Sequence, residues 1–544
     1  MKTLLLSSLT KVFKDKEPNF EEFTQFSCLK NEIFSFQLAF KPEEASETSV
    51  KVNAECELGC HIEIFGVENI PAGKNGYDYS DSFHYPLDTK EFPDLLMPSN
   101  CKTVSSGEWS AFWFEIRPNG MSGSNKIKIT LTAGDMITEK LFSLDIINAE
   151  LPKQKLLYTN WFHNDCLCTY YGTEIFSDEY WQIAENFIKN AVKHGMNMIL
   201  TPVFTPPLDT EIGGERPTVQ LVGVKKDGAK YTFDFKNFKK YVDICLKNGI
   251  EAFEISHFFT QWGAVAAPKI IATVDGEEKR IFGWETDANG EEYTNFLTQF
   301  AVQFKRVTEE LGIRERCWLH ISDEPSLEQI ENYKKSANTV SRLFPDFKTF
   351  DALSDIDFYK TGLVKTPICS EDTADIFKPE VENFWTYHCC GQVRNNLPNR
   401  LFSQPSQRNR ILGILLYKYS AQGFLQWGHN FWYSQYSRYP INPFKITDAD
   451  NAFPSGDAFV VYPGDNKKPL NSLRNSVFAE ALQDLRSLNL LESLTSREYV
   501  LNIIERGLDI PLTFTTYPHE QNWLLNTRKQ INSEIKSHTT LRNK

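Results

Sequence analysis

The sequence predicts a multidomain protein with an N-terminal all-β sandwich, followed by an α/β barrel of the TIM-type (β/α)8 class with C-terminal helices. Three observations lead to this prediction. The chain has 544 residues, which is too many for a single hydrophobic core. Its front carries short strands separated by turns, and its middle repeats a strand and a helix through eight units. We therefore expect a sandwich over residues 1–151, the barrel over 152–491 and a helical or extended segment over 492–544.

The sandwich is predicted from segments that resemble half-buried strands. Strands are expected over residues 33–40, 111–116 and 126–132. The last of these alternates apolar and polar residues, which gives one buried and one wet face. Pro118-Asn119-Gly120 reads as a turn, and Leu151-Pro152-Lys153 as the linker that leaves the sandwich. Short strands with such turns are typical of a β-sandwich.

The barrel is predicted from eight apolar segments that alternate with amphipathic helices. The expected strands are residues 156–162, 196–200, 252–256, 318–322, 349–353, 367–370, 384–387 and 423–427. The clearest helix begins after Ser177, a plausible N-cap, carries one apolar stripe and ends at Gly195. Further helices are expected after Ser326 and over residues 235–247, 291–311, 406–419 and 473–488.

The fourth expected strand ends in two adjacent acids, Asp323 and Glu324, and is stopped by Pro325. Acids are costly at the end of a buried strand unless something there uses or pairs them. In a parallel α/β barrel, the carboxyl ends of the strands are where chemistry is done. A structural alternative is that the same residues merely cap the following helix.

Composition and charge limit the classes of partner. The net charge is −13 and no dense run of Lys or Arg occurs, which argues against nucleic acid and against a membrane surface. Aromatic residues make up 13% of the chain. They either fill large cores or line a carbohydrate site, where the C–H face of a sugar stacks on a ring.

Several features indicate a cytoplasmic protein without cofactor or metal. The first eleven residues contain too short an apolar core for a signal peptide, and no later stretch is long enough to span a bilayer. The eleven cysteines form no disulfide framework, so reduced thiols are expected, with Cys389 and Cys390 as buried thiols. The spacing of His163, His257 and His388 matches no zinc pattern.

Polar and aromatic residues follow most of the expected barrel strands, and together they would form a deep polar cleft with aromatic walls. Such a cleft suits a small carbohydrate or glycoconjugate. The residues expected to bind it are His163, Asp165, His257, Trp262, Trp385, Tyr387, Trp427 and Asn430. Asp165 and Asp209 have the alternative role of loop caps.

The position of the acids favours one type of glycosidase. Neighbouring side chains point in opposite directions from an extended strand, so Asp323 and Glu324 are poor partners across one bond. They suit a mechanism in which Glu324 is the general acid and base, while Asp323 holds the N–H of a 2-acetamido group. The carbonyl oxygen of that group would attack the anomeric carbon and form an oxazoline. Tyr387 could donate to the acetamido oxygen, and Trp385 or Trp427 could contact its methyl group.

Several motifs resemble glycoside hydrolase family 123, whose catalytic domain is also catalogued as a domain of unknown function. They occur in order at residues 161–166, 205–210, 255–263, 321–325, 462–464 and 472–474. The resemblance covers about residues 156–490 and, more loosely, the β-rich front. It implies an exo-acting β-N-acetylgalactosaminidase that uses the substrate-assisted route. The Asp-Glu pair of the family corresponds to Asp323 and Glu324, and its acetamido-binding tyrosine to Tyr387. The preference for galactosamine follows from the resemblance alone.

Two other functions remain open from the sequence. The first is a conventional glycosidase for sugars without the acetamido group, with Glu324 as the acid and Glu371 or Asp351 as the nucleophile. The second is a glycan-binding barrel without turnover.

Overall fold

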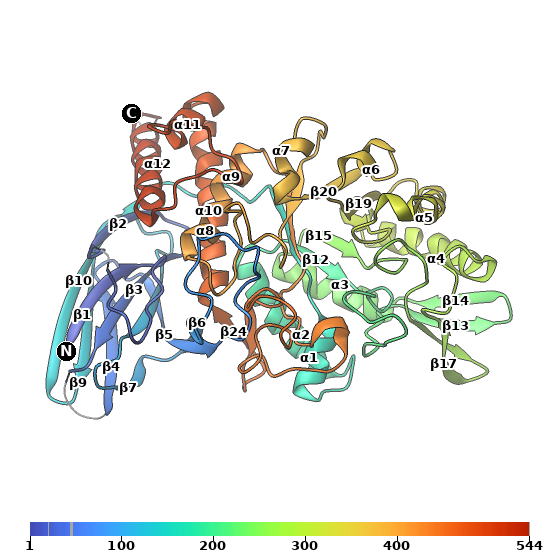
Figure 1. The fold of residues 1–544 in the computed structure, drawn as a ribbon, viewed down its shortest axis with the longest axis horizontal. Helices are drawn as coiled ribbons and strands as arrows, with labels where there is room; N and C mark the ends of the chain where they lie inside the picture. Colours follow the sequence, from blue (N-terminus) through green and yellow to red (C-terminus); the bar gives the residue numbers. More distant parts are fainter. Residues whose placement is uncertain (20, 44–46, 543–544) are drawn as a thin grey trace.

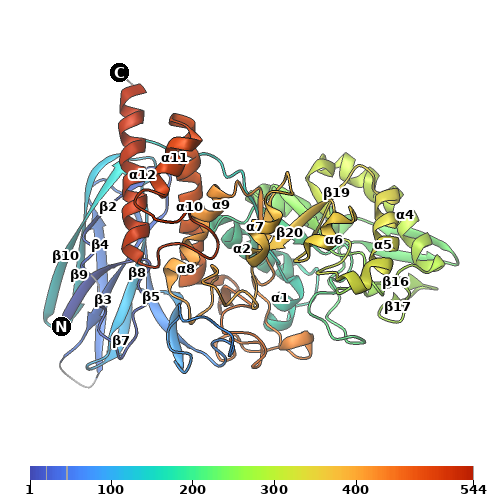
Figure 2. The same cartoon turned by 45° about the horizontal axis from the view of Figure 1, so that its top comes forward.

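The computed structural model describes residues 1–19, 21–43 and 47–542 (Figure 1). Two β-sheets lie at one end of the molecule and a closed barrel lies at the other. The last helices of the chain stand beside the sheets, at the junction with the barrel (Figure 2). Along the described chain, no helix combines the length and apolar character needed to cross a bilayer.

Two sheets enclose the first hydrophobic core. The larger sheet has the order β1 (Lys2–Ser7), β3 (Phe34–Lys41), β8 (Ser110–Arg117), β5 (His61–Pro71), β6 (Glu91–Pro98), β24 (Pro469–Ser472) and β23 (Val461–Pro463). The smaller sheet has the order β2 (Gln25–Leu29), β10 (Met136–Ile147), β9 (Gly123–Ala133), β4 (Glu47–Cys56) and β7 (Cys101–Ser105). Phe36 of the larger sheet stacks on Phe142 of the smaller one, with ring centroids 4.5 Å apart. The three strands expected from the sequence are confirmed as β3, β8 and β9, and this part of the chain is a sandwich.

All eight expected barrel strands are confirmed, and they close into a parallel ring in chain order. They are β11 (Leu157–Asn160), β12 (Met198–Thr201), β15 (Ala252–Ile255), β18 (Cys317–Leu319), β19 (Lys348–Ala352), β20 (Thr366–Ser370), β21 (Trp385–Tyr387) and β22 (Gly423–Gln426). The (β/α)8 class is therefore correct. The strands are short, so most of the residues that follow them have no regular secondary structure. Their side chains can therefore form a site at the carboxyl end of the barrel.

The helices around the barrel agree with the expected pattern. They include α2 (Asp178–Lys193), α3 (Lys236–Asn248), α4 (Glu291–Glu310), α5 (Ile330–Leu343) and α10 (Leu473–Leu494). The Ser177 side chain caps α2 by accepting from the backbone N–H of Tyr180. The helix expected over residues 406–419 is divided into α8 (Ser406–Arg410) and α9 (Leu412–Lys418). Gly413 lies directly against the backbone of Ala481 in α10, where a Cβ atom would clash.

Two additions were not expected from the sequence. A four-stranded sheet is built from β14 (Lys230–Asp234), β13 (Gly223–Asp227), β16 (Ile270–Val274) and β17 (Glu277–Phe282), which lie after the second and third barrel strands. The residues around Pro463 were not among the expected strands. They form the hairpin β23–β24, which extends the sandwich sheet through pairing of Asn471 with Leu96.

A buried ion network joins the sandwich to the C-terminal helices. Arg528 of α12 (Gln521–Arg542) pairs with Glu32 and with Asp484 of α10. Arg410 of α8 pairs with the same Asp484 and with Glu480 at 2.8 Å. All five side chains are buried. The network therefore fixes the sandwich, the barrel and α12 against one another.

Candidate active site

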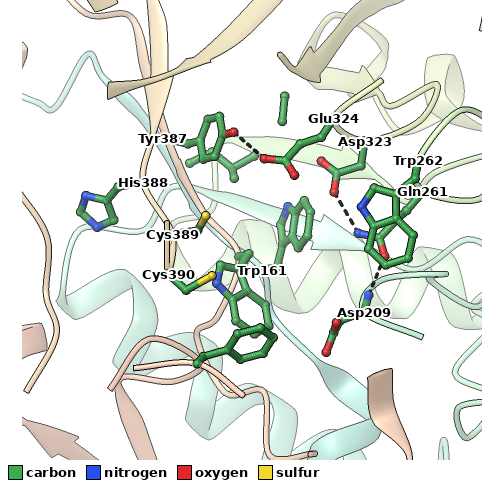
Figure 3. Close-up of a pocket in the computed structure, with 14 residues that line it drawn as sticks. Trp161, Asp209, Gln261, Trp262, Asp323, Glu324, Tyr387, His388, Cys389 and Cys390 are labelled. Atoms are coloured by element: carbon green, nitrogen blue, oxygen red, sulfur yellow. Dashed lines mark hydrogen bonds between the residues drawn. The ribbon is translucent and has the colours of Figure 1, made fainter. Parts of the chain in front are cut away.

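A pocket of about 640 Å³ lies at the carboxyl ends of the barrel strands (Figure 3). Its lining residues are Trp161, Asp209, Gln261, Trp262, Asp323, Glu324, Ala352, Tyr387, His388, Cys389, Cys390, Leu425, Trp427 and Phe453. Of the predicted site residues, Asp323, Glu324, Trp262, Tyr387 and Trp427 are brought together here.

Asp323 and Glu324 face the same pocket because the chain is not extended where they lie. The strand β18 ends at Leu319, and Glu324 adopts a left-handed backbone conformation with φ of 44°. The opposite orientation expected for neighbouring residues on a strand therefore does not apply. Asp323 is buried and Glu324 is exposed. The next turn has its own cap, Ser326, which forms a capping box with Gln329, so the acid pair is not needed as a helix cap.

Asp323 is oriented by the amide of Gln261. The Nε2 group of Gln261 donates to Oδ2 of Asp323 at 2.9 Å, and its Oε1 accepts from the backbone N–H of Asp209 at 2.7 Å. Burial and the adjacent charge of Glu324 raise the pKa of Asp323 from 3.8 to about 7. Asp323 can therefore change its protonation state near neutral pH.

Glu324 is oriented by a tyrosine from the other side of the barrel. The hydroxyl of Tyr387 donates to Oε1 of Glu324 at 2.5 Å and lies 3.1 Å from Oγ of Ser354. Burial and the charge of Glu324 raise the pKa of Tyr387 well above its usual range. The tyrosine therefore keeps its proton and remains a hydrogen-bond donor.

Three buried ionisable side chains, Glu254, His320 and Asp351, form a hydrogen-bonded stack beneath the acid pair. His320 contacts Oε1 of Glu254 through Nε2 at 2.6 Å and Oδ1 of Asp351 through Nδ1 at 3.1 Å. Burial lowers the pKa of His320, but the hydrogen bonds and charges of the two carboxylates outweigh burial and raise it to about 9. Asp351 also accepts from the backbone N–H of Ile321 at 3.1 Å. The stack therefore holds the segment that carries Asp323.

The two residues proposed as nucleophiles of a conventional glycosidase do not line the pocket. Asp351 belongs to the stack beneath it. Glu371 is 1% exposed and accepts from Nδ1 of His388 at 3.0 Å. Burial raises the pKa of Glu371 well above its usual range. Neither carboxylate is placed to attack a sugar in this pocket.

Aromatic side chains form the walls and the rim. Trp161 is 4% exposed, and its Nε1 donates to Glu254 at 2.6 Å. Trp427 donates from Nε1 to Oδ2 of buried Asp457 at 2.9 Å and packs on Phe453. Trp262 is 38% exposed, and its backbone N–H donates to the carbonyl of Asp323. These rings offer both a buried and an open stacking surface to a sugar.

Two of the expected binding residues lie inside the barrel, below the pocket. Trp385 packs against Trp318 and Phe350 and fills the space beside Gly423. Its expected contact with an acetamido methyl group is not supported by this position, because its side chain points into the barrel core. His257 stacks on His320 with ring centroids 4.1 Å apart and does not line the pocket either.

Three other expected binding residues lie behind the pocket wall and position it. Asn430 bonds to the backbone N–H and carbonyl of His163, at 2.9 and 3.0 Å. Arg216 pairs with Asp165 through two hydrogen bonds and donates to Nδ1 of His163. Nε2 of His163 therefore carries the hydrogen donated to the carbonyl of Trp427 at 3.0 Å. Burial and the charge of Arg216 lower the pKa of His163 to about 3, so the ring is neutral.

The geometry shows the roles of further residues around the site. Gln261, Trp161 and Asp457 act through hydrogen bonds between segments that are far apart in the sequence, so these roles do not follow from any local spacing. Asp209 lines the pocket, and its Oδ2 accepts from the backbone N–H of Tyr436 at 3.0 Å. Burial raises the pKa of Asp209 to about 6. No group of three or more His, Cys, Asp or Glu suited to a metal ion occurs in the described residues.

Comparison with known families decides which enzymes this site belongs with. The sequence model of the glycoside hydrolase 123 catalytic domain matches residues 161–491, which is more than half of the chain. The chain belongs to glycoside hydrolase family 123. The expected resemblance is thus confirmed: the chain is a glycosidase with a carbohydrate substrate.

The fold of this chain is shared with a solved structure of the same family. A family 123 glycoside hydrolase from Clostridium perfringens, analysed for glycolipid glycan hydrolysis, is 15% identical with a TM-score of 0.76, and the match covers 99% of this chain and 98% of that one. A putative β-galactosidase from Bacteroides fragilis is 9% identical with a TM-score of 0.33 over 87% of this chain and 60% of that one. No match was found among curated proteins.

Proposed function

We propose that this family 123 glycosidase is an exo-acting, retaining β-N-acetylgalactosaminidase that uses the acetamido group of its substrate as the nucleophile. The observation that carries the proposal is the placement of Asp323 and Glu324 side by side in one pocket. Asp351 and Glu371 lie outside that pocket. The galactosamine preference rests on the family resemblance of the motifs.

In the first step, the acetamido oxygen attacks the anomeric carbon while Glu324 donates a proton to the leaving oxygen. Asp323, as a carboxylate, accepts the acetamido N–H and stabilises the positive charge that develops on the oxazoline. Gln261 keeps Asp323 in place through the 2.9 Å hydrogen bond. The exposed position of Glu324 suits contact with the leaving group at the mouth of the pocket.

In the second step, Glu324 removes a proton from water, and that water attacks the anomeric carbon and opens the oxazoline. Two displacements at one carbon retain its configuration. Tyr387 donates to Glu324 in the free site. On binding, the same hydroxyl donates to the acetamido oxygen instead, and this contact orients that oxygen for attack.

Asp209 is the carboxylate through which a two-carboxylate mechanism could still operate, since it is the third acid of the pocket. In Figure 3, its side chain lies on the far side of Gln261 from Asp323. We assign it to a sugar hydroxyl rather than to the anomeric carbon, because its carboxylate is already held by the backbone of Tyr436.

A panel of chromogenic β-glycosides tests the proposal. It contains galactosides and glucosides, each with and without the 2-acetamido group. We expect turnover of the 2-acetamido galactoside, and inhibition by a thiazoline that mimics the oxazoline. Efficient hydrolysis of plain galactosides without thiazoline inhibition would contradict the proposal and favour a nucleophilic carboxylate such as Asp209. Binding of sugar without release of product would contradict turnover altogether.

A further inference from the structure

Two consecutive cysteines, Cys389 and Cys390, form part of the pocket wall, although the sequence suggested buried thiols. Both are partly exposed and neither is in a disulfide. Figure 3 shows their sulfur atoms on the same side of the pocket. They follow Tyr387, the residue that binds Glu324, by two and three positions.

The chain around the two cysteines is held in place by hydrogen bonds. The backbone N–H of Cys389 donates to Oε1 of Gln392, and its carbonyl accepts from Nδ2 of Asn399, both at 2.8 Å. The side chains of Cys389 and Cys390 interact directly, and Cys390 also interacts with the hydroxyl of Tyr77. The two sulfur atoms are therefore already close together in the folded protein.

The protonation state of Cys389 limits the kinds of reagent that can react with this thiol. Its hydrogen bond with Cys390 and its burial raise the pKa of its thiol well above the usual range. A protonated thiol reacts slowly with alkylating agents, which need the thiolate. A direct disulfide between neighbouring residues would also be strained. A reagent that bridges the two sulfur atoms through a single atom and takes up both thiol protons needs neither a free thiolate nor a direct disulfide.

We propose that Cys389 and Cys390 form a dithiol site for trivalent arsenicals, and that occupation of this site blocks the active-site pocket. With phenylarsine oxide, two As–S bonds form while the As=O bond and two S–H bonds break. Both thiol protons leave in one water molecule, and arsenic keeps its oxidation state. Two thiols acting together raise the apparent affinity by about 10²–10⁴-fold over one thiol.

A second pair of neighbouring thiols supplies a matched control. Cys56 and Cys60 lie in the sandwich, away from the pocket, and the backbone N–H of Cys60 donates to Sγ of Cys56. Cys60 is buried. Arsenic bound to this pair would leave the pocket open. Cys101 is exposed and serves as the control for a single accessible thiol.

The test uses the full chain treated with phenylarsine oxide. Intact-mass spectrometry and peptide mapping locate the adduct, and hydrolysis of the chromogenic 2-acetamido galactoside measures the block. We expect one arsenic per chain across Cys389 and Cys390, with loss of activity that 2,3-dimercaptopropanol reverses. Cys389→Ser and Cys390→Ser should each lose this sensitivity relative to their own untreated activity, whereas Cys56→Ser should keep it.

The two halves of the proposal fail in different ways. An adduct on Cys56 and Cys60 alone, or no adduct at all, would overturn the dithiol site, and mass spectrometry shows this whether or not the protein hydrolyses the substrate. An adduct on Cys389 and Cys390 without loss of activity would overturn the block. The block rests on the proposed function. If the untreated protein hydrolyses no member of the glycoside panel, that function fails while the mass measurement still tests the site. Circular dichroism of each serine variant checks that it is folded.

Discussion

Two buried aspartates show how the same degree of burial serves assembly in one place and chemistry in another. Asp484 lies at the junction of sandwich, barrel and α12, and Asp323 lies in the active-site pocket. Burial favours the neutral form of both. Asp484 faces the guanidinium groups of Arg410 and Arg528, which outweigh burial and lower its pKa. Asp323 faces a neutral amide and a neighbouring carboxylate, so its pKa rises to about 7.

Asp484 therefore stays charged near neutral pH, whereas Asp323 can gain or lose a proton there. Arginines stay protonated throughout the physiological range, so the pairs of Asp484 with Arg410 and Arg528 stay charged at neutral pH. The pocket has no arginine among its lining residues. It pairs carboxylates with an amide, a phenol and, beneath the floor, a histidine. These neutral and titratable partners let a proton move without breaking the fold.

The largest expected effect comes from removing Glu324, the proposed proton donor. Glu324→Gln keeps the shape but cannot donate or accept the reacting proton. We expect kcat to fall by about 10²–10⁴-fold with an unchanged melting temperature, because general acid–base groups contribute this much and the side chain is exposed. Glu328→Gln, on the neighbouring exposed turn, is the matched control and should keep full activity. Unchanged activity in Glu324→Gln would remove it from the mechanism.

The junction network gives the largest expected effect on stability. Arg528→Met leaves Glu32 buried without its partner, and breaking a buried pair from one side costs about 3–5 kcal/mol. Urea unfolding measures the loss, while kcat of the folded fraction should remain. Lys536→Met on the same helix removes an exposed pair with Asp145 and should cost less than about 1 kcal/mol. Equal stability of the two variants would show that burial does not set the strength of this contact.

Asp323→Asn tests the role of the Asp323 charge by two independent measurements. We expect kcat to fall by about 10²–10³-fold, as for loss of one preorganised electrostatic group, together with weaker thiazoline inhibition. In the parent enzyme, kcat/KM should fall as the pH drops below about 7, because protonated Asp323 cannot accept the acetamido N–H. The variant should lack this acidic limb.

The stability of Asp323→Asn follows from the sign of the pKa shift. A raised pKa in the folded state means that ionisation of Asp323 destabilises the fold. The cost is absent below the unfolded pKa near 3.8, grows as the pH rises and is complete above about 7. Asparagine removes that cost, so the variant should be more stable than the parent at pH 8 and equal to it near pH 4. A variant less stable than its parent at pH 8 would contradict the raised pKa.

The comparison also explains how much could be predicted from the sequence. The barrel strands and most helices follow from local apolar periodicity, which is why all eight strands were found. The hairpin β23–β24 was missed because its partner β6 lies far away in the chain. Asp323 and Glu324 stand out because acids rarely end an apolar run. Their common orientation could not be predicted, since it depends on the turn at Glu324.

Residues that act through a distant partner were assigned the least accurately. His163 and Asp165 follow the first barrel strand and were expected to touch sugar. They bind Arg216 instead, and no local pattern places that arginine beside them. Trp385 lies on a barrel strand as expected, but its side chain points into the core rather than to the pocket. The position of a residue along a strand thus predicts the end of the barrel at which it lies, but not the side chain that it contacts.

The smallest of these effects concerns the hydroxyl that links the two sides of the pocket. Tyr387→Phe removes the donor to Glu324 and, in the proposed complex, the donor to the acetamido oxygen. A hydrogen bond to a charged group contributes about 1.5–3 kcal/mol, so kcat/KM should fall by about 10–10²-fold. Tyr419→Phe removes a comparable bond to Asp375 outside the pocket and should leave kcat/KM unchanged. If Tyr387 orients the acetamido oxygen, the loss should be mainly in kcat, since attack by that oxygen depends on its alignment. A loss confined to KM would instead limit Tyr387 to holding the substrate in the ground state.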